Sequence, residues 1–351
     1  CYYIVYSLSM TKNDILELKQ LLKDPKKIVI VPHKNPDGDA MGSSLGLYHY
    51  LTALHHNVDL IVPNDYPAFL KWIPGDNSVL IYESNVDIAN KIIGEADLIF
   101  TLDFNALHRT GEMELPLTES KAVKILIDHH QQPDSYARYI YSDVSICATS
   151  QMIYHFLEML DTTKSITPEI ATCLYVGIMT DTGSFRFPST TSITHRVIAD
   201  LIDKGADNAS IHNNVYDANS YNRLLLLGQA LSNLQILPSY KTAYITLTNE
   251  EKNRFDFQKG DTEGVVNYAL SLEGIIFAVI FIEDIDQQIV KISLRSKGSF
   301  SVNQFARDHF NGGGHDNAAG GKETISLDAT ISKFLKILPT YKKELLNSYE
   351  E

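Results

Sequence analysis

Short apolar runs, each followed by aspartate or histidine, recur through the first half of the chain and constrain its fold more than any other feature. The runs cover residues 27–31, 96–102, 123–127 and 174–180. Where such runs alternate with helical patterns, they predict buried parallel strands joined by βαβ crossovers. We therefore expect an α/β fold with a parallel sheet and flanking helices, in which all four runs are strands. Thr167 and Pro168 also predict the start of a helix.

The side chains that follow these runs predict the position of a functional site. In open α/β sheets, ligands bind outside the carboxyl ends of the strands. Carboxylates and imidazoles clustered at such an edge suit two divalent cations that act on a phosphoryl group. The candidate residues, in the order of the runs that they follow, are His33, Asp37 and Asp39; Asp103; Asp128, His129 and His130; and Asp181.

The residues that follow the first run and the one that follows the second run suggest separate roles. Residues 36–39 are typical of a tight turn, because proline fixes φ and glycine tolerates positive φ. Such a turn would let His33, Asp37 and Asp39 face one cavity, although a solvated turn would have the same sequence. Asp103 follows a strongly apolar run, where an unpaired carboxylate would be costly to bury. It could bridge two metal ions about 3.5–4 Å apart, or it could cap a helix.

The adjacent histidines cannot both point the same way from a regular element, so one could bind metal while the other reaches the substrate. Metal-binding histidines commonly donate their second N–H to a carboxylate, and Asp128 is the candidate partner. Asp181 would complete the ligand set, or it could be an ordinary residue at a helix end. Arg109, six residues after Asp103, could reach the same cavity or lie on the surface.

The composition changes in the second half, which indicates a second, smaller α/β domain. A long helix over residues 221–237 would connect the two domains. The predicted strands are 242–248, 275–282 and 289–294, and the predicted helices are 262–271 and 302–310. The expected division is 11–205 for the first domain, 206–240 for the connector and 241–346 for the second domain, with residues 1–10 as a non-native or disordered leader.

A glycine run at residues 312–314 precedes His315 in the second domain. Consecutive glycines allow backbone N–H groups to form an anion-binding nest against a helix start, although a flexible loop has the same composition. Arg295 and His315 would add side-chain donors to a phosphate. The candidate substrate-binding residues are therefore Arg109, Arg295, Gly313, Gly314 and His315.

Charge and hydropathy limit the partners of the chain. The formal net charge is −13 and no block of lysine or arginine occurs, whereas a grip on long nucleic acid usually needs a basic face. No apolar run has the length of a transmembrane helix. The first residues are unlike a signal peptide. The three cysteines do not have the spacing of metal ligands or of a disulfide pair. We expect a cytoplasmic protein with no membrane partner and no long nucleic-acid track. His55 and His56 are expected to face solvent.

The motifs together resemble those of the DHH-type phosphoesterases that carry a DHH-associated second domain, and within them the nanoRNase (oligoribonuclease) and pAp-phosphatase branch. The resemblance covers roughly residues 14–338, and the motifs occur in family order. It implies two domains with the active site in the cleft between them. Asn311 departs from the pattern, because many relatives have another glycine there.

The resemblance also implies roles for the site residues. The implied metal ligands form two sets: His33 and Asp37 for one Mn²⁺, and Asp39, His129 and Asp181 for the other, with Asp103 as the bridge. His130 would contact the scissile phosphate and would act with Asp103 and Asp128 as the catalytic group. Arg295 and His315 would bind the far end of the substrate.

These expectations describe a hydrolase that uses two divalent cations. Carboxylate and imidazole ligands suit Mn²⁺, and Mg²⁺ or Co²⁺ could substitute. The expected substrates are short single-stranded oligoribonucleotides, cut to 5′-mononucleotides, and small phosphorylated nucleotides such as pAp, which would lose its 3′-phosphate. A cyclic-di-AMP or linear pApA phosphodiesterase remains an alternative, and a catalytically silent nucleotide-binding module is an alternative of another class. The chain could form a homodimer.

Overall fold

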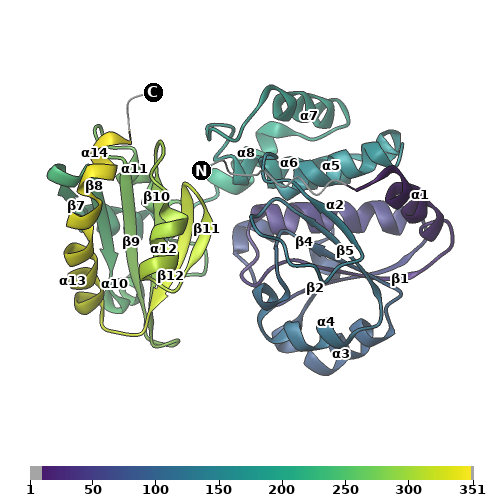
Figure 1. The fold of residues 1–351 in the computed structure, drawn as a ribbon, viewed down its shortest axis with the longest axis horizontal. Helices are drawn as coiled ribbons and strands as arrows, with labels where there is room; N and C mark the ends of the chain where they lie inside the picture. Colours follow the sequence, from purple (N-terminus) through teal and green to yellow (C-terminus); the bar gives the residue numbers. More distant parts are fainter. Residues whose placement is uncertain (1–9, 349–351) are drawn as a thin grey trace. The chain divides into compact units, whose positions relative to one another are not determined.

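Figure 1 shows the fold of the chain in a computed structural model, which describes residues 10–348. The chain divides into two compact units between Ala218 and Asn219. This division falls inside the predicted connector, residues 206–240, and residues 1–9 of the expected leader lie outside the described residues. Each unit combines helices with a six-stranded sheet. The predicted α/β fold class is therefore confirmed for both parts of the chain.

The first unit contains a parallel sheet with strand order β3-β2-β1-β4-β5-β6. Neighbouring strands pair in parallel throughout. The order reverses between β1 and β4, and the crevice at such a switch point is where open α/β sheets bind ligands. The strands are β1 (Lys27–Val31), β2 (Asn57–Val62), β3 (Val79–Ile81), β4 (Leu98–Leu102), β5 (Val123–Asp128) and β6 (Tyr139–Ser142).

Helices cover both faces of this sheet, as Figure 1 shows. Alternate residues of the central strands enter two separate cores. Ile28, Ile30 and Phe100 pack with the helices of one face, whereas Val29 and Ile99 pack with those of the other. The helices are α1 (Lys12–Leu21), α2 (Gly38–Ala53), α3 (Val86–Glu95), α4 (Glu114–Glu119), α5 (Thr149–Met159), α6 (Pro168–Asp181), α7 (Ser192–Asp203) and α8 (Asn208–Tyr216).

The prediction that residues 174–180 form a strand is wrong, because they belong to helix α6. Thr167 caps this helix by accepting a hydrogen bond from the Ile170 N–H, and Pro168 is its first residue. The helix lies in the core, and nearly all of its residues from Ile170 to Met179 are buried. A helix that is apolar on every side shows no amphipathic period, so its sequence imitates a buried strand.

The second unit contains a mixed sheet with strand order β11-β12-β10-β9-β8-β7. β8 and β9 are parallel, and the other neighbours are antiparallel. The strands are β7 (Gln235–Leu237), β8 (Thr242–Leu247), β9 (Phe277–Asp284), β10 (Ile289–Ser296), β11 (Gly313–His315) and β12 (Ala318–Glu323). The helices are α9 (Tyr221–Ser232), α10 (Asn249–Arg254), α11 (Val265–Leu270), α12 (Val302–His309), α13 (Leu327–Ile337) and α14 (Lys342–Asn347).

The predicted connecting helix over residues 221–237 is too long. Helix α9 ends at Ser232, where Asn233 terminates it, and Gln235–Leu237 forms the edge strand β7. The three predicted strands and two predicted helices of this unit occur close to their expected positions, as β8, β9, β10, α11 and α12. Across residues 10–348, no helix combines the length and the apolarity that crossing a membrane would require.

Candidate metal centre

The segment between β1 and α2, together with the first turn of α2, supplies three of the predicted ligands. Asp37 is the N-cap of α2, and its carboxylate accepts hydrogen bonds from the N–H groups of Asp39 and Ala40, both at 3.0 Å. Gly38 is therefore the first residue of a helix and not the pivot of a tight turn. Its small size is needed for packing, since a Cβ there would lie 2.3 Å from the Thr180 hydroxyl oxygen on α6.

Asp103 follows β4 and has a left-handed backbone, with φ of 64°. The residue is 2% exposed. The Oδ2 atom lies 3.5 Å from Nε2 of His33, and the Oδ1 atom lies 3.5 Å from Nε2 of His129. The two oxygens of this one carboxylate thus face two different histidines.

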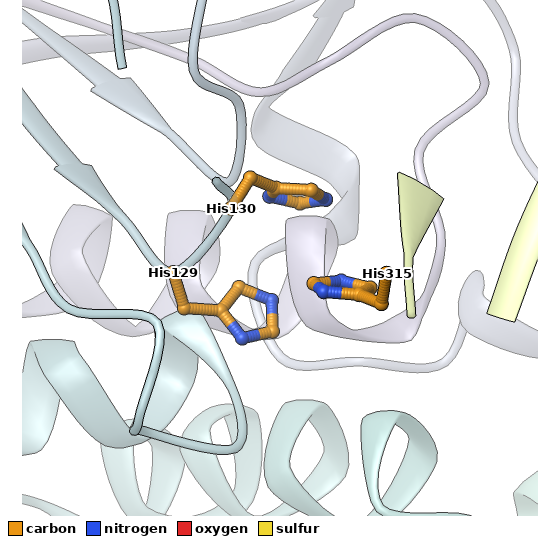
Figure 2. Close-up of side chains that lie close together, drawn as sticks. All are labelled: His129, His130 and His315. Carbon is orange, nitrogen blue, oxygen red and sulfur yellow. The ribbon is translucent and has the colours of Figure 1, made fainter. Parts of the chain in front are cut away.

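His129 and His130 follow β5 and turn their rings to different partners. Figure 2 shows both side chains, whose rings are 5.0 Å apart and inclined at 76°. Nδ1 of His129 lies 3.1 Å from the Ile146 carbonyl oxygen, and Nδ1 of His130 lies 2.7 Å from Oδ1 of Asp128. Asp128 therefore supports His130, and not His129, the histidine that the resemblance implies as the metal ligand. The adjacent side chains diverge, so each is oriented by a different part of the fold.

Asp39 and Asp181 approach His129 from two different helices. Nε2 of His129 lies 3.6 Å from Oδ2 of Asp181 and 3.9 Å from Oδ2 of Asp39. Asp181 is the last residue of α6 and Asp39 lies in the first turn of α2. Although the expected strand does not exist, the helix brings Asp181 to the predicted place.

The ligand atoms form two groups that meet at Asp103. Potential ligand atoms of His33, Asp37 and Asp103 lie within 4.8 Å of one another, and the same is true of Asp39, His129 and Asp181. Buried carboxylates and neutral imidazoles are ligands that Mn²⁺, Mg²⁺ and related divalent cations use. This donor set fits two divalent cations.

The pKa values of these groups are shifted because several carboxylates are buried close together. Burial lowers the pKa of His33, but the nearby carboxylates of Asp103 and Asp37 outweigh it and raise that pKa to about 9. Burial, together with Asp37 and Asp103, raises the pKa of Asp181 to about 6. Burial and the neighbouring Asp103 and Asp181 also raise the pKa of Asp39 well above its usual range. Without cations the cluster therefore holds protons in their place, and metal binding would release them.

The sequence analysis missed the start of helix α5, which contacts two of these carboxylates. The N–H groups of Thr149 and Ser150 donate to the two oxygens of Asp39 at 2.6 and 2.8 Å. The Thr149 hydroxyl donates to Oδ1 of Asp103 at 2.9 Å. Hydroxyl residues near a helix start could have signalled the helix itself, but not the carboxylates, which are distant in sequence.

Arg109 lies in the short helical segment Leu107–Met113 that follows Asp103. Its carbonyl oxygen accepts a hydrogen bond from the Lys34 N–H at 2.8 Å, beside His33. The charge of Arg109 is close enough to His33 to have a small lowering effect on the pKa of that imidazole. The side chain is half-buried. The Arg109 backbone therefore lies beside His33, and the role of its side chain stays a prediction.

The predicted phosphate residues of the second unit lie on adjoining strands. Ala318 on β12 pairs with Arg295 on β10 and, on its other side, with His315 on β11. Residues paired across a sheet share a face, and two strand spacings place these backbones ~10 Å apart. Arg295 and His315 therefore lie in one row, with the small Ala318 between them.

The glycine run does not form a nest at a helix start. It follows the end of α12, and Gly313–His315 is the edge strand β11. Close contact explains the glycines: a Cβ on Gly312 would lie 2.0 Å from the Gly320 carbonyl oxygen, and one on Gly314 would lie 2.5 Å from that of Ala318. Asn303 of α12 fixes this strand, since its Oδ1 accepts a hydrogen bond from the Gly314 N–H at 3.0 Å.

Comparisons with known proteins agree with this arrangement. Residues 27–178 match the DHH family, N-terminal domain, and residues 239–341 match the DHHA1 domain. The chain is 31% identical to the bifunctional oligoribonuclease and PAP phosphatase NrnA of Thermus thermophilus, over 92% of this chain and 91% of the relative. It is 28% identical to NrnA of Bacillus subtilis, over 84% of this chain and 88% of that protein.

A solved structure shares both the sequence and the fold. The crystal structure of an exopolyphosphatase-related protein from Bacteroides fragilis is 41% identical, with a TM-score of 0.92, and the match covers 97% of this chain and all of that one. Both the family matches and the relatives span the two units. The chain therefore belongs to the DHH family of phosphoesterases, is an enzyme of that family, and carries a DHHA1 domain in its second unit.

Proposed function

We propose that this enzyme hydrolyses short oligoribonucleotides to 5′-mononucleotides and also removes the 3′-phosphate of pAp, with two divalent cations as cofactors. The names of the Thermus and Bacillus relatives support this choice of substrates. The observation that carries the proposal is the carboxylate of Asp103, whose two oxygens lie 3.5 Å from His33 on one side and 3.5 Å from His129 on the other. One side chain shared between two ligand groups is what a two-metal hydrolase needs.

Each of the two ligand groups would hold one cation. His33 and Asp37 would hold one, Asp39, His129 and Asp181 would hold the other, and Asp103 would touch both. When bound, the cations would supply a water of lowered pKa and positive charge beside the phosphoryl oxygens. Mixed carboxylate and imidazole donors favour Mn²⁺, and Mg²⁺ or Co²⁺ could replace it.

His130 and Asp128 would act on the substrate. Because Asp128 accepts from Nδ1 of His130 at 2.7 Å, it fixes the tautomer and the direction of the ring. A histidine held in this way can hydrogen-bond the scissile phosphate through Nε2 and stabilise the charge that develops there.

The second unit would bind the part of the substrate that does not react. Arg295 and His315 can each donate to a phosphate oxygen, and their shared row suits two contacts on one extended ligand. Charge-assisted contacts of this kind are stronger than neutral ones. Arg109 would add a further positive charge near the first ligand group.

A substrate panel tests the proposal. The full chain, stripped with EDTA and supplied with Mn²⁺, should cleave di- to pentaribonucleotides and pAp, and EDTA should abolish the activity. Cyclic-di-AMP, linear pApA, pyrophosphate and polyphosphate complete the panel. Preferred cleavage of cyclic-di-AMP or pApA would replace the oligonucleotide proposal, and preferred cleavage of polyphosphate would favour the kind of activity that the name of the Bacteroides relative suggests.

Substitution of the shared carboxylate tests the cofactor. Asp103→Ala should lower kcat roughly 10³-fold, or ~4 kcal/mol, and should reduce the bound metal. Asp59→Asn is a matched control, since Asp59 lies on β2 of the same sheet and belongs to neither ligand group. A folded Asp103→Ala protein that keeps more than about a tenth of the activity would contradict the bridging role. Hydrolysis of bis-p-nitrophenyl phosphate separates the enzyme from a silent binding module.

A further inference from the structure

The first turn of α5 contacts both carboxylates on which the two ligand groups depend. The Thr149 N–H donates to Oδ2 of Asp39 and the Ser150 N–H donates to Oδ1, so both oxygens of that carboxylate are held. The Thr149 hydroxyl donates to Oδ1 of Asp103. Thr149 and Ser150 are fully buried, and Asp39 and Asp103 are 1% and 2% exposed. These bonds are therefore made in a part of the protein that water does not reach.

We propose that Thr149 is the positioning residue of the two-metal centre: its hydroxyl fixes the plane of the Asp103 carboxylate so that each oxygen faces one ligand group. The inference rests on the proposed function and deepens it. It assigns to Thr149 no contact with substrate or metal. Thr149 acts through Asp103, and through its backbone also on Asp39.

The Thr149 hydroxyl makes the shortest of the contacts that orient the Asp103 carboxylate. The terminal torsion of an aspartate is broad and has no sharply preferred angle. The residue also has a left-handed backbone, a conformation that non-glycine residues adopt only where their surroundings hold them. Nε2 of each of the two histidines lies 3.5 Å away, on opposite oxygens. The Thr149 hydroxyl, at 2.9 Å, is closer and restricts the rotation more strongly.

The backbone of the same turn acts on Asp39. N–H groups at the start of a helix bind carboxylates well, because they are unpaired within the helix and carry partial positive charge. Two such donors hold both oxygens of the Asp39 carboxylate. One short segment thus places a ligand of the second group and the residue shared by both groups.

Helix α6 is shaped to let this turn approach. A Cβ on Gly177 would lie 1.9 Å from Oγ of Ser150 and 2.8 Å from Oδ1 of Asp39. Only glycine leaves room there for the start of α5 beside the carboxylate. Three elements, α2, α5 and α6, therefore fit together around the contacts that Thr149 and Ser150 make.

The hydroxyl can be tested separately from the shape of the residue. Thr149→Val replaces the hydroxyl with a methyl group of similar size, and Thr149→Ser restores the hydroxyl without the methyl group. Thr330→Val is a matched control, because Thr330 is also fully buried in a helix but donates to the Ser326 carbonyl oxygen in the second unit. Mn²⁺ binding to each full-length protein is measured by titration calorimetry, and the electron paramagnetic resonance spectrum reports whether the two ions are coupled.

We expect Thr149→Val to weaken the binding of Mn²⁺ about 10- to 100-fold, the usual effect of removing a partner of a metal ligand, and to lose the spectrum of coupled ions. Thr149→Ser and Thr330→Val should bind as the wild type does. Wild-type affinity and coupling in Thr149→Val, or an equal loss in Thr149→Ser, would overturn the inference. If Thr149→Val does not fold, Thr149→Ala, which needs no extra space, must show the same loss.

Failure of the proposed function gives a different result. In that case the wild type itself would bind no coupled pair of Mn²⁺ ions, or would bind them and cleave no phosphodiester. Failure of the inference is seen only in the variants, while the wild type binds and cleaves as proposed.

Discussion

The three histidines of the candidate metal centre each have Nδ1 directed at a protein oxygen. The oxygens belong to the Lys34 carbonyl for His33, the Ile146 carbonyl for His129 and the Asp128 carboxylate for His130. A histidine held at one nitrogen has a fixed tautomer and ring direction. These contacts leave Nε2 of His33 and of His129 directed at the Asp103 carboxylate.

His56 shows the opposite effect, in which the fold disfavours a charge. The sequence predicted that His56 faces solvent, but it is 6% exposed, and Nδ1 accepts a hydrogen bond from the Lys26 N–H at 3.2 Å. Only His55 is exposed. Burial lowers the pKa of His56 in the folded protein. Protonation of Nδ1 would also break the bond to Lys26.

We therefore predict that His56 makes the protein less stable in mild acid. Above the unfolded pKa of ~6.5 the imidazole is neutral in both states, and its contribution to stability is complete. As the pH falls below that value, the unfolded chain takes up a proton that the folded protein resists, and stability is lost. The free energy of unfolding in urea, measured with EDTA between pH 5 and 8, should fall toward pH 5.

His56→Asn is the variant that isolates this effect. Its side chain can still accept from the Lys26 N–H but does not titrate, so its unfolding free energy should fall less than that of the wild type toward pH 5. Exposed His55→Asn is the matched control and should keep the wild-type slope. Parallel pH profiles for the wild type and His56→Asn would show that His56 is not responsible.

At the scale of elements, the sequence predicted the strands β1, β4 and β5 and the residues that follow them, because these segments are short, apolar and sharply bounded. It failed where burial or close packing removes the usual pattern. Residues 174–180 are buried on all sides, so a helix looked like a strand. The glycines at 312 and 314 reflect contact with β12 and not a nest.

The hydrogen bonds of Thr149, and the hydrogen bond between Asp128 and His130, could not be predicted from the sequence for a different reason. Thr149 is 110 positions from Asp39 and 46 from Asp103, and nothing in the local sequence indicates which carboxylate a helix start will meet. Asp128 precedes both histidines, and only the turn after β5 decides which ring comes back to it.

Helices α2 and α6 depend on a close approach that glycine permits. A Cβ on Gly42 would lie 2.5 Å from the Cys173 carbonyl oxygen and 2.8 Å from the Gly177 nitrogen, both of them backbone atoms that cannot easily move. Gly42→Ala should therefore destabilise the first unit by ~1–3 kcal/mol and weaken metal binding, because α2 carries Asp37 and Asp39. Urea unfolding and Mn²⁺ titration measure the two effects.

Gly94→Ala is the matched control for this prediction. Gly94 lies in α3, and a Cβ there would meet no atom within 4 Å. Alanine should be neutral or stabilise the helix by up to ~1 kcal/mol. Equal stability of the two variants would mean that α2 and α6 can separate without cost.

The row formed by Arg295, Ala318 and His315 predicts a separation of binding from chemistry. His315→Ala or Arg295→Ala should raise the KM for a dinucleotide or pAp about 10- to 100-fold, since each removes a charge-assisted contact worth ~1.5–3 kcal/mol. Some loss of kcat is expected, because binding energy also orients the reacting phosphate. Metal content should not change.

The generic substrate bis-p-nitrophenyl phosphate provides the control for this row. It has no second phosphate, so both variants should hydrolyse it almost as fast as the wild type. Loss of the metals in either variant, or an equal loss of activity on the nucleotide and on the generic substrate, would place these residues in the chemistry and not in binding.

At the scale of the whole molecule, charge determines what kind of nucleic acid the enzyme can use. Under the proposed function, the net charge of −13 would repel a long polyanion, and the attraction would come from a few local groups: the two cations, Arg109, Arg295 and His315. Binding to single strands weakens with salt by a factor that grows with the number of phosphates contacted. An enzyme that contacts about two phosphates should therefore show a shallow dependence on salt.

The preference for substrate length should depend on the same charges. Each nucleotide beyond the contacted phosphates adds negative charge and no partner, so di- to pentaribonucleotides should have a much higher kcat/KM than a 24-mer. The slope of log KM against log salt for a dinucleotide should be about 1.4, or ~0.7 for each of two phosphates. Measurement uses end-labelled RNA of each length at several salt concentrations, with saturating Mn²⁺. Equal kcat/KM on the 24-mer and the dinucleotide, with a steep salt slope, would instead require an extended basic track and a processive exonuclease.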